Sequence, residues 1–454
     1  MGTELRILSP TAILGYGFPI ESFEKGLDLD PDLIAVDGGS TDPGPYYLGA
    51  GKSFTDRTAV KRDLKLMIKA GLEKEVPVVV GTGGGSGANS HLEWCLDIVR
   101  ELAEEEELDF KLGYLKSEID KDTLKKYYNE DKVLPLDHDE DNYMEELEEA
   151  TRVVGQMGYE PIIELLDNDA DVIICGRVYD PTVFAALGVK EGFKPGLAVH
   201  MGKILECAAI ASDPGSGSDC MFGVLKEDHF TLTPLNPIRK CTTISVAAHT
   251  LYEKNNPMKL HGPGGVLDLT DSNFEQLDER TVKVTGSKFI PDEDYTIKLE
   301  AARLVGYRTI SIAGTRDPIM IDQIEDIIEE VRKAVKDNFV GEVNSDDYSL
   351  IFRIYGKNGI MGDLEPNQEI SSHELGIVIE VVANTQELAN TICSFARSTM
   401  LHYGYKGRVA TAGNLAFPYS PSDIKAGEVY EFCLNYLLVV DDPLELCSLH
   451  YEEL

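Results

Sequence analysis

The sequence predicts an α/β protein in which a doubly wound, mostly parallel sheet forms the amino-terminal domain and a two-layer α+β domain follows. Three observations lead to this prediction. Short apolar runs alternate with amphipathic stretches through the first half of the chain. Segments rich in glycine and aspartate directly follow several of these runs. From about residue 308 the order changes to strand–helix–strand–strand–helix. Strands that alternate with helices are typical of a parallel sheet covered on both faces.

The apolar runs of the first half are expected to be buried strands, and the amphipathic stretches between them are expected to be helices. Glycine or a polar turn closes each run, as is usual for strands. The expected strands are 7–15, 32–39, 76–84, 110–115 and 171–176, and the expected helices are 56–70, 91–106, 121–128 and 142–156.

The pattern changes near residue 215, where short apolar runs are separated by glycine, proline and asparagine. We therefore expect a ligand-binding α/β domain at 1–290 with a β-rich excursion at about 215–290, and an α+β domain at 291–454. The order of elements in the second domain is typical of a ferredoxin-like fold. Its expected strands are 308–314, 348–356 and 375–383, and its expected helices are 321–340 and 386–402.

Composition excludes several classes of protein. The 454 residues include 42 basic and 79 acidic side chains, which give a formal net charge of −37. A field of this sign repels phosphate, so nucleic acid is not an expected partner. No apolar stretch approaches the roughly 20 residues of a membrane-spanning helix, so no membrane contact is expected either. The eight cysteines form no CxxC pair, as expected for free thiols in a reducing cytoplasm.

A glycine-rich segment, Gly81–Gly87, follows one expected strand and precedes a helix. Glycines let a ligand approach the backbone, and amides at a helix start favour negative charge. Gly83, Gly84, Gly85 and Ser86 are therefore candidates for binding a phosphate, a pyrophosphate or a carboxylate. A merely tight strand–helix turn is the alternative, because the dinucleotide fingerprint is incomplete and no lysine follows the glycines as in a Walker motif.

Asp37 ends another apolar run, and Asp42 lies in the turn that follows it. Ligands of open α/β sheets bind beyond the carboxyl ends of the strands, which makes Asp37 a candidate catalytic group. Asp37 and Asp42 are also the candidate ligands of Mg²⁺, if the protein uses a metal. The alternative is an Asx-turn network in which these side chains cap their own loop.

Two arginines are candidates for binding an anionic group of the substrate. Arg57 lies at an expected helix start, and Arg177 follows the last strand of the first half. Either guanidinium group could clamp a carboxylate with two hydrogen bonds. A structural ion pair is the alternative for Arg177. Asp180, which precedes Pro181, is expected to cap the next helix.

One helix and the turn after it contain further candidates. His200, Lys203 and Glu206 are three residues apart and therefore lie near one helix face, where they could serve in acid–base catalysis. We name His200 and Lys203 as catalytic candidates, and a packed histidine is the alternative for His200. Ser216 and Ser218 lie in a polar turn that could form a second anion-binding nest.

Several long blocks together resemble one family of proteins. These blocks are GYGFPIESFEKGL, DLIAVDGGSTDPGPYYLG, GKSFTDR, GTGGGSGA, HLEW, VIICGRVYDP, DPGSGSDCMFGVL and GPGGVLDL. Through them the chain resembles the acyclic terpene utilisation A family, from about residue 5 to about residue 420. The resemblance implies a catabolic role of the kind that gives the family its name, the bacterial breakdown of citronellol and geraniol through branched acyl-CoA intermediates. It also implies a small partner subunit of about a hundred residues, since relatives carry such a domain, fused or separate.

The leading functional hypothesis is a lyase or hydratase that acts on a small branched hydroxy- or unsaturated acid, or on its CoA thioester. Such chemistry needs an acid, a base and a group that holds an oxyanion or carboxylate. Two alternatives remain open at this point. One is an Mg²⁺-dependent enzyme for a phosphorylated or nucleotide ligand. The other is a non-catalytic subunit that binds acyl-CoA or stabilises a partner. A homo-oligomer is expected in each case.

Overall fold

The computed structural model describes residues 4–136, 142–252, 255–367 and 369–454. The chain forms two compact units. The larger unit comprises Met1–Arg303 and Phe432–Leu454, and the smaller unit comprises Leu304–Glu431. Each unit has its own hydrophobic core. Among the described residues, no helix combines the length and the apolar character that crossing a bilayer requires.

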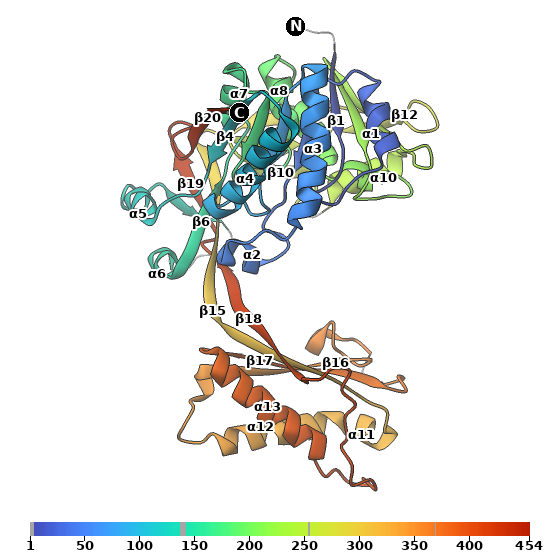
Figure 1. The fold of residues 1–454 in the computed structure, drawn as a ribbon, viewed down its shortest axis with the longest axis vertical. Coiled ribbons are helices and arrows are strands. Elements are labelled where there is room, and N and C mark those ends of the chain that lie inside the picture. The colour runs from blue at the N-terminus through green and yellow to red at the C-terminus, as the bar shows by residue number, and fades with distance from the viewer. Residues whose placement is uncertain (1–3, 137–141, 253–254, 368) are drawn as a thin grey trace. The chain divides into compact units, whose positions relative to one another are not determined.

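A ten-stranded mixed sheet forms the centre of the larger unit (Figure 1). Its five central strands are parallel and lie in the order β1 (Glu4–Ser9), β2 (Leu33–Asp37), β3 (Val78–Gly81), β7 (Val172–Cys175) and β4 (Lys111–Lys116). Antiparallel strands extend both edges: β20 (Ser448–Glu453) beside β4, and then β8 (Met221–Lys226), β9 (His229–Pro234), β13 (Val282–Thr285) and β12 (Asn273–Gln276) beyond β1. The prediction of a mixed α/β protein with a large, partly parallel sheet is confirmed.

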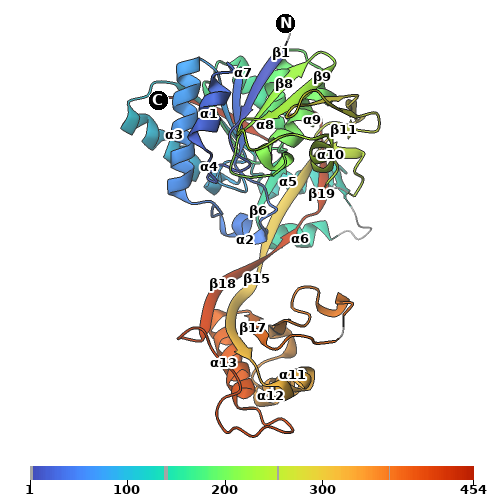
Figure 2. The same ribbon diagram turned by 90° about the vertical axis from the view of Figure 1, so that its right-hand side faces the viewer.

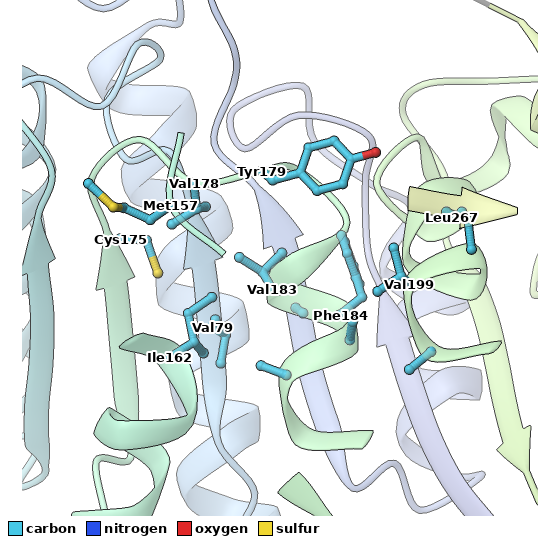
Figure 3. Close-up of a cluster of buried hydrophobic side chains, with 14 of the residues drawn as sticks. Val79, Met157, Ile162, Cys175, Val178, Tyr179, Val183, Phe184, Val199 and Leu267 are labelled. Carbon is cyan, nitrogen blue, oxygen red and sulfur yellow. The ribbon is translucent and has the colours of Figure 1, made fainter. Parts of the chain in front are cut away.

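Helices cover both faces of this sheet (Figures 1 and 2). One face packs against α1 (Ile20–Leu27), α3 (Arg57–Lys74) and α4 (Asn89–Glu106), and the other against α7 (Glu160–Asp167), α8 (Thr182–Lys190) and α9 (Pro195–Leu205). Successive strand residues point to opposite faces, so Ile34 belongs to one core and Ala35 to the other. Because both faces are buried, the parallel strands are apolar at nearly every position. Figure 3 shows part of the core between the sheet and helices α7, α8 and α9, where Val79 packs near Val183 and Phe184 of α8.

The rest of the larger unit contains shorter elements. They are α2 (Pro45–Ala50), α5 (Lys121–Asn129), β5 (Val133–Pro135), α6 (Tyr143–Glu149), β6 (Ala150–Gln156), α10 (Thr243–Leu251), the three-stranded sheet of β10 (Lys259–Gly262), β11 (Gly265–Asp268) and β14 (Lys288–Pro291), and β19 (Tyr436–Val440). The expected helix 142–156 is wrong in its second half, which is strand β6. Two valines and a threonine favour an extended chain there, and β6 pairs with the start of the long strand β15 (Tyr295–Thr315).

The smaller unit contains an antiparallel sheet and two main helices. Its strands lie in the order β16 (Tyr348–Tyr355), β17 (Leu375–Ala383), the end of β15, and β18 (Asp423–Cys433). The helices α12 (Ile324–Asn338) and α13 (Gln386–His402) pack on the sheet, and α11 (Pro318–Asp322) precedes them. A single core joins isoleucines of α12 and α13 to the inward residues of β17. Helix α12 corresponds to the helix expected at 321–340, and it begins and ends slightly inside those limits.

Candidate active site at the strand ends

Polar side chains gather where the parallel strands of the larger unit end. Asp37 is the last residue of β2, and Arg177 follows β7 by two residues. Lys203 lies in the last turn of α9, and Glu206 caps that helix. All four side chains are more than nine-tenths buried. The carboxyl ends of parallel strands are the usual ligand-binding edge of such a sheet, so this group is the candidate active site.

Arg177 binds two carboxylates. Its Nε donates to Oε2 of Glu300 at 2.6 Å, and its Nη1 donates to Oδ1 of Asp180 at 2.6 Å. Burial opposes the charge of the guanidinium group, but Glu300 and Asp180 outweigh it and raise the pKa of Arg177. Burial likewise opposes the charge of Glu300, and Arg177 outweighs it and lowers the pKa of that carboxyl group. Arg177 therefore joins the loop after β7 to strand β15 through a buried ion pair.

Lys203 forms a second buried ion pair, with Glu206. Nζ of Lys203 donates to Oε1 of Glu206 at 2.6 Å and lies 4.5 Å from the ring centroid of Tyr252. Burial opposes its charge, but the carboxylate of Glu206 prevails and raises the pKa of Lys203 above its ordinary value. Sγ of Cys207 lies 3.3 Å from the hydroxyl of Tyr252. Burial and the charge of Glu206 raise the pKa of this thiol to about 12, so it is a neutral group at ordinary pH.

The surroundings of Asp37 favour the protonated form of its carboxyl group. Burial and the nearby charge of Asp180 raise its pKa well above the usual range, and Glu206 adds to the effect. The amide of Gly39 donates to its Oδ1 at 3.1 Å, but this hydrogen bond and the charge of Arg177 only partly oppose the rise. A carboxyl group in such surroundings keeps its proton at higher pH than an ordinary aspartate, which suits it to act as an acid.

His200, by contrast, is held within the core. Nδ1 lies 2.6 Å from the hydroxyl of Ser287, and Nε2 lies 3.1 Å from the hydroxyl of Thr250. The ring meets Phe230 edge to face. Burial, with a smaller contribution from Lys203, lowers the pKa of His200 to about 3, so the ring is neutral. Both of its nitrogens already have partners within the protein.

The glycine loop packs closely against the rest of the protein. The amide of Gly83 donates to the carbonyl of Cys175 at 2.7 Å. A Cβ on Gly84 would lie 2.2 Å from the carbonyl oxygen of His91, and a Cβ on Gly87 would lie 2.3 Å from the amide of Arg177. The amide of Asn89 at the start of α4 donates to Glu118, whose carboxylate already occupies an anion position. Gly85 has φ +106°, and the buried Oγ of Ser86 has no hydrogen-bond partner among the described residues.

The remaining candidate residues lie outside the cluster. Arg57, half exposed at the start of α3, donates to Oε2 of Glu101 at 2.5 Å. The amide of Ser218 donates to Oγ of Ser216 at 3.2 Å, so these two serines brace their own turn. Asp42 is exposed, and its amide donates to Ser40 at 3.2 Å. Within the described ranges, no three His, Cys, Asp or Glu side chains converge as they would around a metal ion.

A cavity of about 330 Å³ opens beside the Arg177–Glu300 pair. Thr41, Asp42, Glu146, Lys298 and Glu300 contribute its polar lining, with Cys433 among the other residues of the wall. Nζ of Lys298 lies 3.6 Å from Oε1 of Glu300. The cavity is lined by three carboxylates and one cation, so it favours neutral or hydroxyl-bearing groups over strongly anionic ones.

Several residues of the cluster were not foreseen. Asp180 does not cap the following helix as expected, because its carboxylate binds Arg177 and Pro181 is the residue at the cap position. Tyr179 and Tyr252 have no local signal that would single them out. Glu300 lies 123 residues beyond Arg177 in an ordinary strand sequence, so only the tertiary fold brings them together. The structure groups two of the catalytic candidates, Asp37 and Lys203, with the anion-binding candidate Arg177, and places His200 apart from them.

The fold is that of a mixed α/β protein with a buried, charged cluster at the carboxyl ends of its parallel strands. A family model described as acyclic terpene utilisation family protein AtuA matches residues 52–217 and 237–422. The chain belongs to this family, and the membership supports a catabolic role. Comparisons with curated proteins and with solved structures found no match.

Proposed function

We propose that the protein is a catabolic lyase or hydratase that acts on a small branched hydroxy- or unsaturated acid, or on its CoA thioester. The observation that carries this proposal is the buried position of the Asp37 carboxyl group and the resulting preference for its protonated form. Its carboxyl group lies at the carboxyl end of β2, and burial together with Asp180 raises its pKa. Eliminating or adding water requires an acid, a base and a group that stabilises negative charge, and a protonated carboxyl group beside a lysine–glutamate pair can supply all three.

The groups of the cluster divide between the steps of an elimination. Glu206 takes a proton from the carbon next to the carbonyl group. The bond from the next carbon to its hydroxyl oxygen breaks, a carbon–carbon double bond forms, and Asp37 gives its proton to the leaving oxygen, which departs as water. Lys203 stands beside the negative charge that develops on the carbonyl oxygen. Hydration follows the same steps in reverse.

Other candidate residues receive supporting roles. Arg177 favours the ionised form of Glu300, and the charge of Asp180 favours the protonated form of Asp37. His200 has no part in proton transfer, since both of its nitrogens are engaged. Both buried cations already pair with carboxylates, so the phosphates of a CoA thioester would bind outside this cluster.

The test compares Asp37→Asn with Asp32→Asn, an exposed aspartate just before the same strand. Purified protein is given dimethylacrylate or its CoA thioester, and formation of the β-hydroxyisovalerate product is followed. We expect Asp37→Asn to lower turnover by about a hundred- to ten-thousand-fold, because a general acid is removed. Asp32→Asn should retain wild-type turnover. Full activity of Asp37→Asn would contradict the assignment, and activity that disappears on chelation would favour the Mg²⁺-dependent alternative.

The proposal extends to the assembly and the architecture. We propose a cytoplasmic homo-oligomer that binds a small partner subunit, on the basis of the family resemblance and the acidic composition. The strand order of the smaller unit, with two helices on its sheet, supports a ferredoxin-like domain at the carboxy-terminal end. Purification from the native host should recover a second, smaller chain with this one. Recovery of this chain alone would contradict the partner.

A further inference from the structure

The tip of the hairpin formed by β10 and β11 lies against two tyrosine rings. This tip is the His261-Gly-Pro-Gly-Gly265 segment. A Cβ on Gly262 would lie 2.8 Å from Cε1 of Tyr179, and a Cβ on Gly264 would lie 2.5 Å from Cε2 of Tyr295. Both rings therefore occupy space that exists only because these positions are glycine.

The two hydroxyl groups have different surroundings. Tyr295 donates its hydrogen bond to Oε2 of Glu160 on α7 at 2.7 Å. Tyr179 follows Arg177 and precedes Asp180, and Figure 3 shows its hydroxyl pointing away from the apolar cluster that contains Val183. The charges of Glu206, Lys203 and Asp180 all act on this hydroxyl. The hairpin thus contacts one tyrosine that belongs to the candidate active site and one that does not.

The backbone of Tyr179 is fixed on both sides. Its amide donates to the carbonyl of Met157 at 2.8 Å, and its own carbonyl accepts from the hydroxyl of Thr182 at 2.5 Å. The side chain is only 7% exposed, and Gly262 bounds one side of the ring. A phenol held in this way has little freedom to turn, which is what a preorganised hydrogen-bond donor requires.

Tyr179 keeps its proton in these surroundings. Burial, and next the charge of Glu206, raise the pKa of the hydroxyl above its ordinary value. A neutral phenol donates a hydrogen bond without adding charge to a site that already holds several carboxylates. The Lys203 ammonium group nearby supplies the positive charge that complements such a donor.

We propose that Tyr179 is a catalytic residue that donates a hydrogen bond to the substrate's carbonyl or carboxylate oxygen as negative charge develops on it. Gly262 is the positioning residue that sets where the ring lies. This inference rests on the proposed function, because it places Tyr179 in the same site as Asp37.

The central test compares Tyr179→Phe with Tyr295→Phe, a matched removal of one hydroxyl from each ring. With dimethylacrylate and its CoA thioester as substrates, Tyr179→Phe should lower kcat by about a hundred- to a thousand-fold, as the loss of one oxyanion donor does, and change KM little. Tyr295→Phe should retain kcat within a few-fold. Equal activity of the two variants would overturn the proposal.

A double-mutant cycle tests the positioning role. Gly262→Ala should lower kcat in the protein that contains Tyr179 and have little further effect in the Tyr179→Phe background, because the two residues act through one hydroxyl. A merely structural role of Gly262 would give additive losses in both backgrounds, and that result would overturn the positioning claim.

A second measurement separates this inference from the proposed function. Loss of turnover in Asp37→Asn but not in Tyr179→Phe would leave the proposed function standing and overturn the role of Tyr179. If the wild-type protein does not turn over either probe, the proposed function fails. Tyr179 is then judged by NMR of protein labelled at the tyrosine ζ carbon. A shift of the Tyr179 signal on adding the probes, without a shift of Tyr295, supports contact with the ligand, and no shift overturns it.

Discussion

At the scale of single residues, the charges of the buried cluster explain the state of Asp37. The described cluster contains four carboxyl groups, those of Asp37, Asp180, Glu206 and Glu300, and the two cations Arg177 and Lys203. Each cation pairs at short range with carboxylates other than Asp37. Asp37 therefore has the least compensation for its negative charge, and its protonated form is favoured.

Arg177→Met should destabilise the protein by about 3–5 kcal/mol, because it removes the buried cation that pairs at short range with both Glu300 and Asp180. The double variant Arg177→Met with Glu300→Leu should recover part of that loss, since the buried charge of Glu300 is removed together with its partner, while Asp180 still loses its ion pair. Urea denaturation measures both free energies of unfolding. Arg57→Met, which breaks a half-exposed pair with Glu101, is the control and should cost about 1 kcal/mol or less. A double variant no more stable than Arg177→Met alone would show that packing, and not charge, dominates.

At the scale of elements, the glycine loop between β3 and α4 shows that one sequence pattern is compatible with two different structural roles. The spacing of its glycines predicts either an anion cradle or a tight turn, and nothing local decides between them. In the fold, Gly84 faces the carbonyl of His91 and Gly87 faces the backbone of Arg177. Close packing alone thus accounts for glycine at these two positions. The loop holds the start of α4 against the segment that presents Arg177.

Gly84→Ala should destabilise the protein by at least about 2 kcal/mol, because φ is +73° and the new Cβ would meet backbone that cannot move away easily. Thermal and urea denaturation give the change in stability. Gly404→Ala serves as the control, since a Cβ there would meet nothing within 4 Å and the backbone needs no positive φ. Equal stability of the two variants would contradict the packing role of the loop.

The elements of the sheet could be predicted from the sequence because their signals are local. Continuous apolar runs, closed by glycine or aspartate, identify β2, β3 and β7, and the family resemblance follows from whole blocks of sequence. Strand β6 was missed because the acidic, helix-favouring residues of α6 directly precede it, and its valines and threonine are a weak signal without the pairing with β15. The partners of the site arise in the same way from the tertiary fold: Glu300 and Tyr252 reach the cluster from segments with no chemical signature.

At the scale of the whole molecule, buried titratable groups set the response to acid. Burial lowers the pKa of three histidines: His91 to about 4, His200 to about 3 and His249 to about 4. The unfolded chain binds protons at these side chains near pH 6.5, where the folded protein does not. Stability from these groups is therefore present above that pH and is lost as the pH falls. Asp37 and Glu160, whose pKa values burial raises, act in the opposite direction.

The histidine contribution can be isolated with His200→Gln, since glutamine can still form hydrogen bonds but cannot take up a proton. Between about pH 7.5 and about pH 5.5, the unfolding free energy of the wild-type protein should fall by about 1.4 kcal/mol more than that of the variant. The reason is that His200 takes up a proton only in the unfolded wild-type chain, and the variant lacks this site. Urea denaturation at both pH values measures this difference, which is independent of any constant cost of the substitution. His402→Gln, at an exposed position at the end of α13, is the control substitution. If His200→Gln and His402→Gln have the same pH dependence, His200 takes up a proton in the folded protein. Its ring is then not held neutral by hydrogen bonds at both nitrogens, and the argument that excludes it from proton transfer fails.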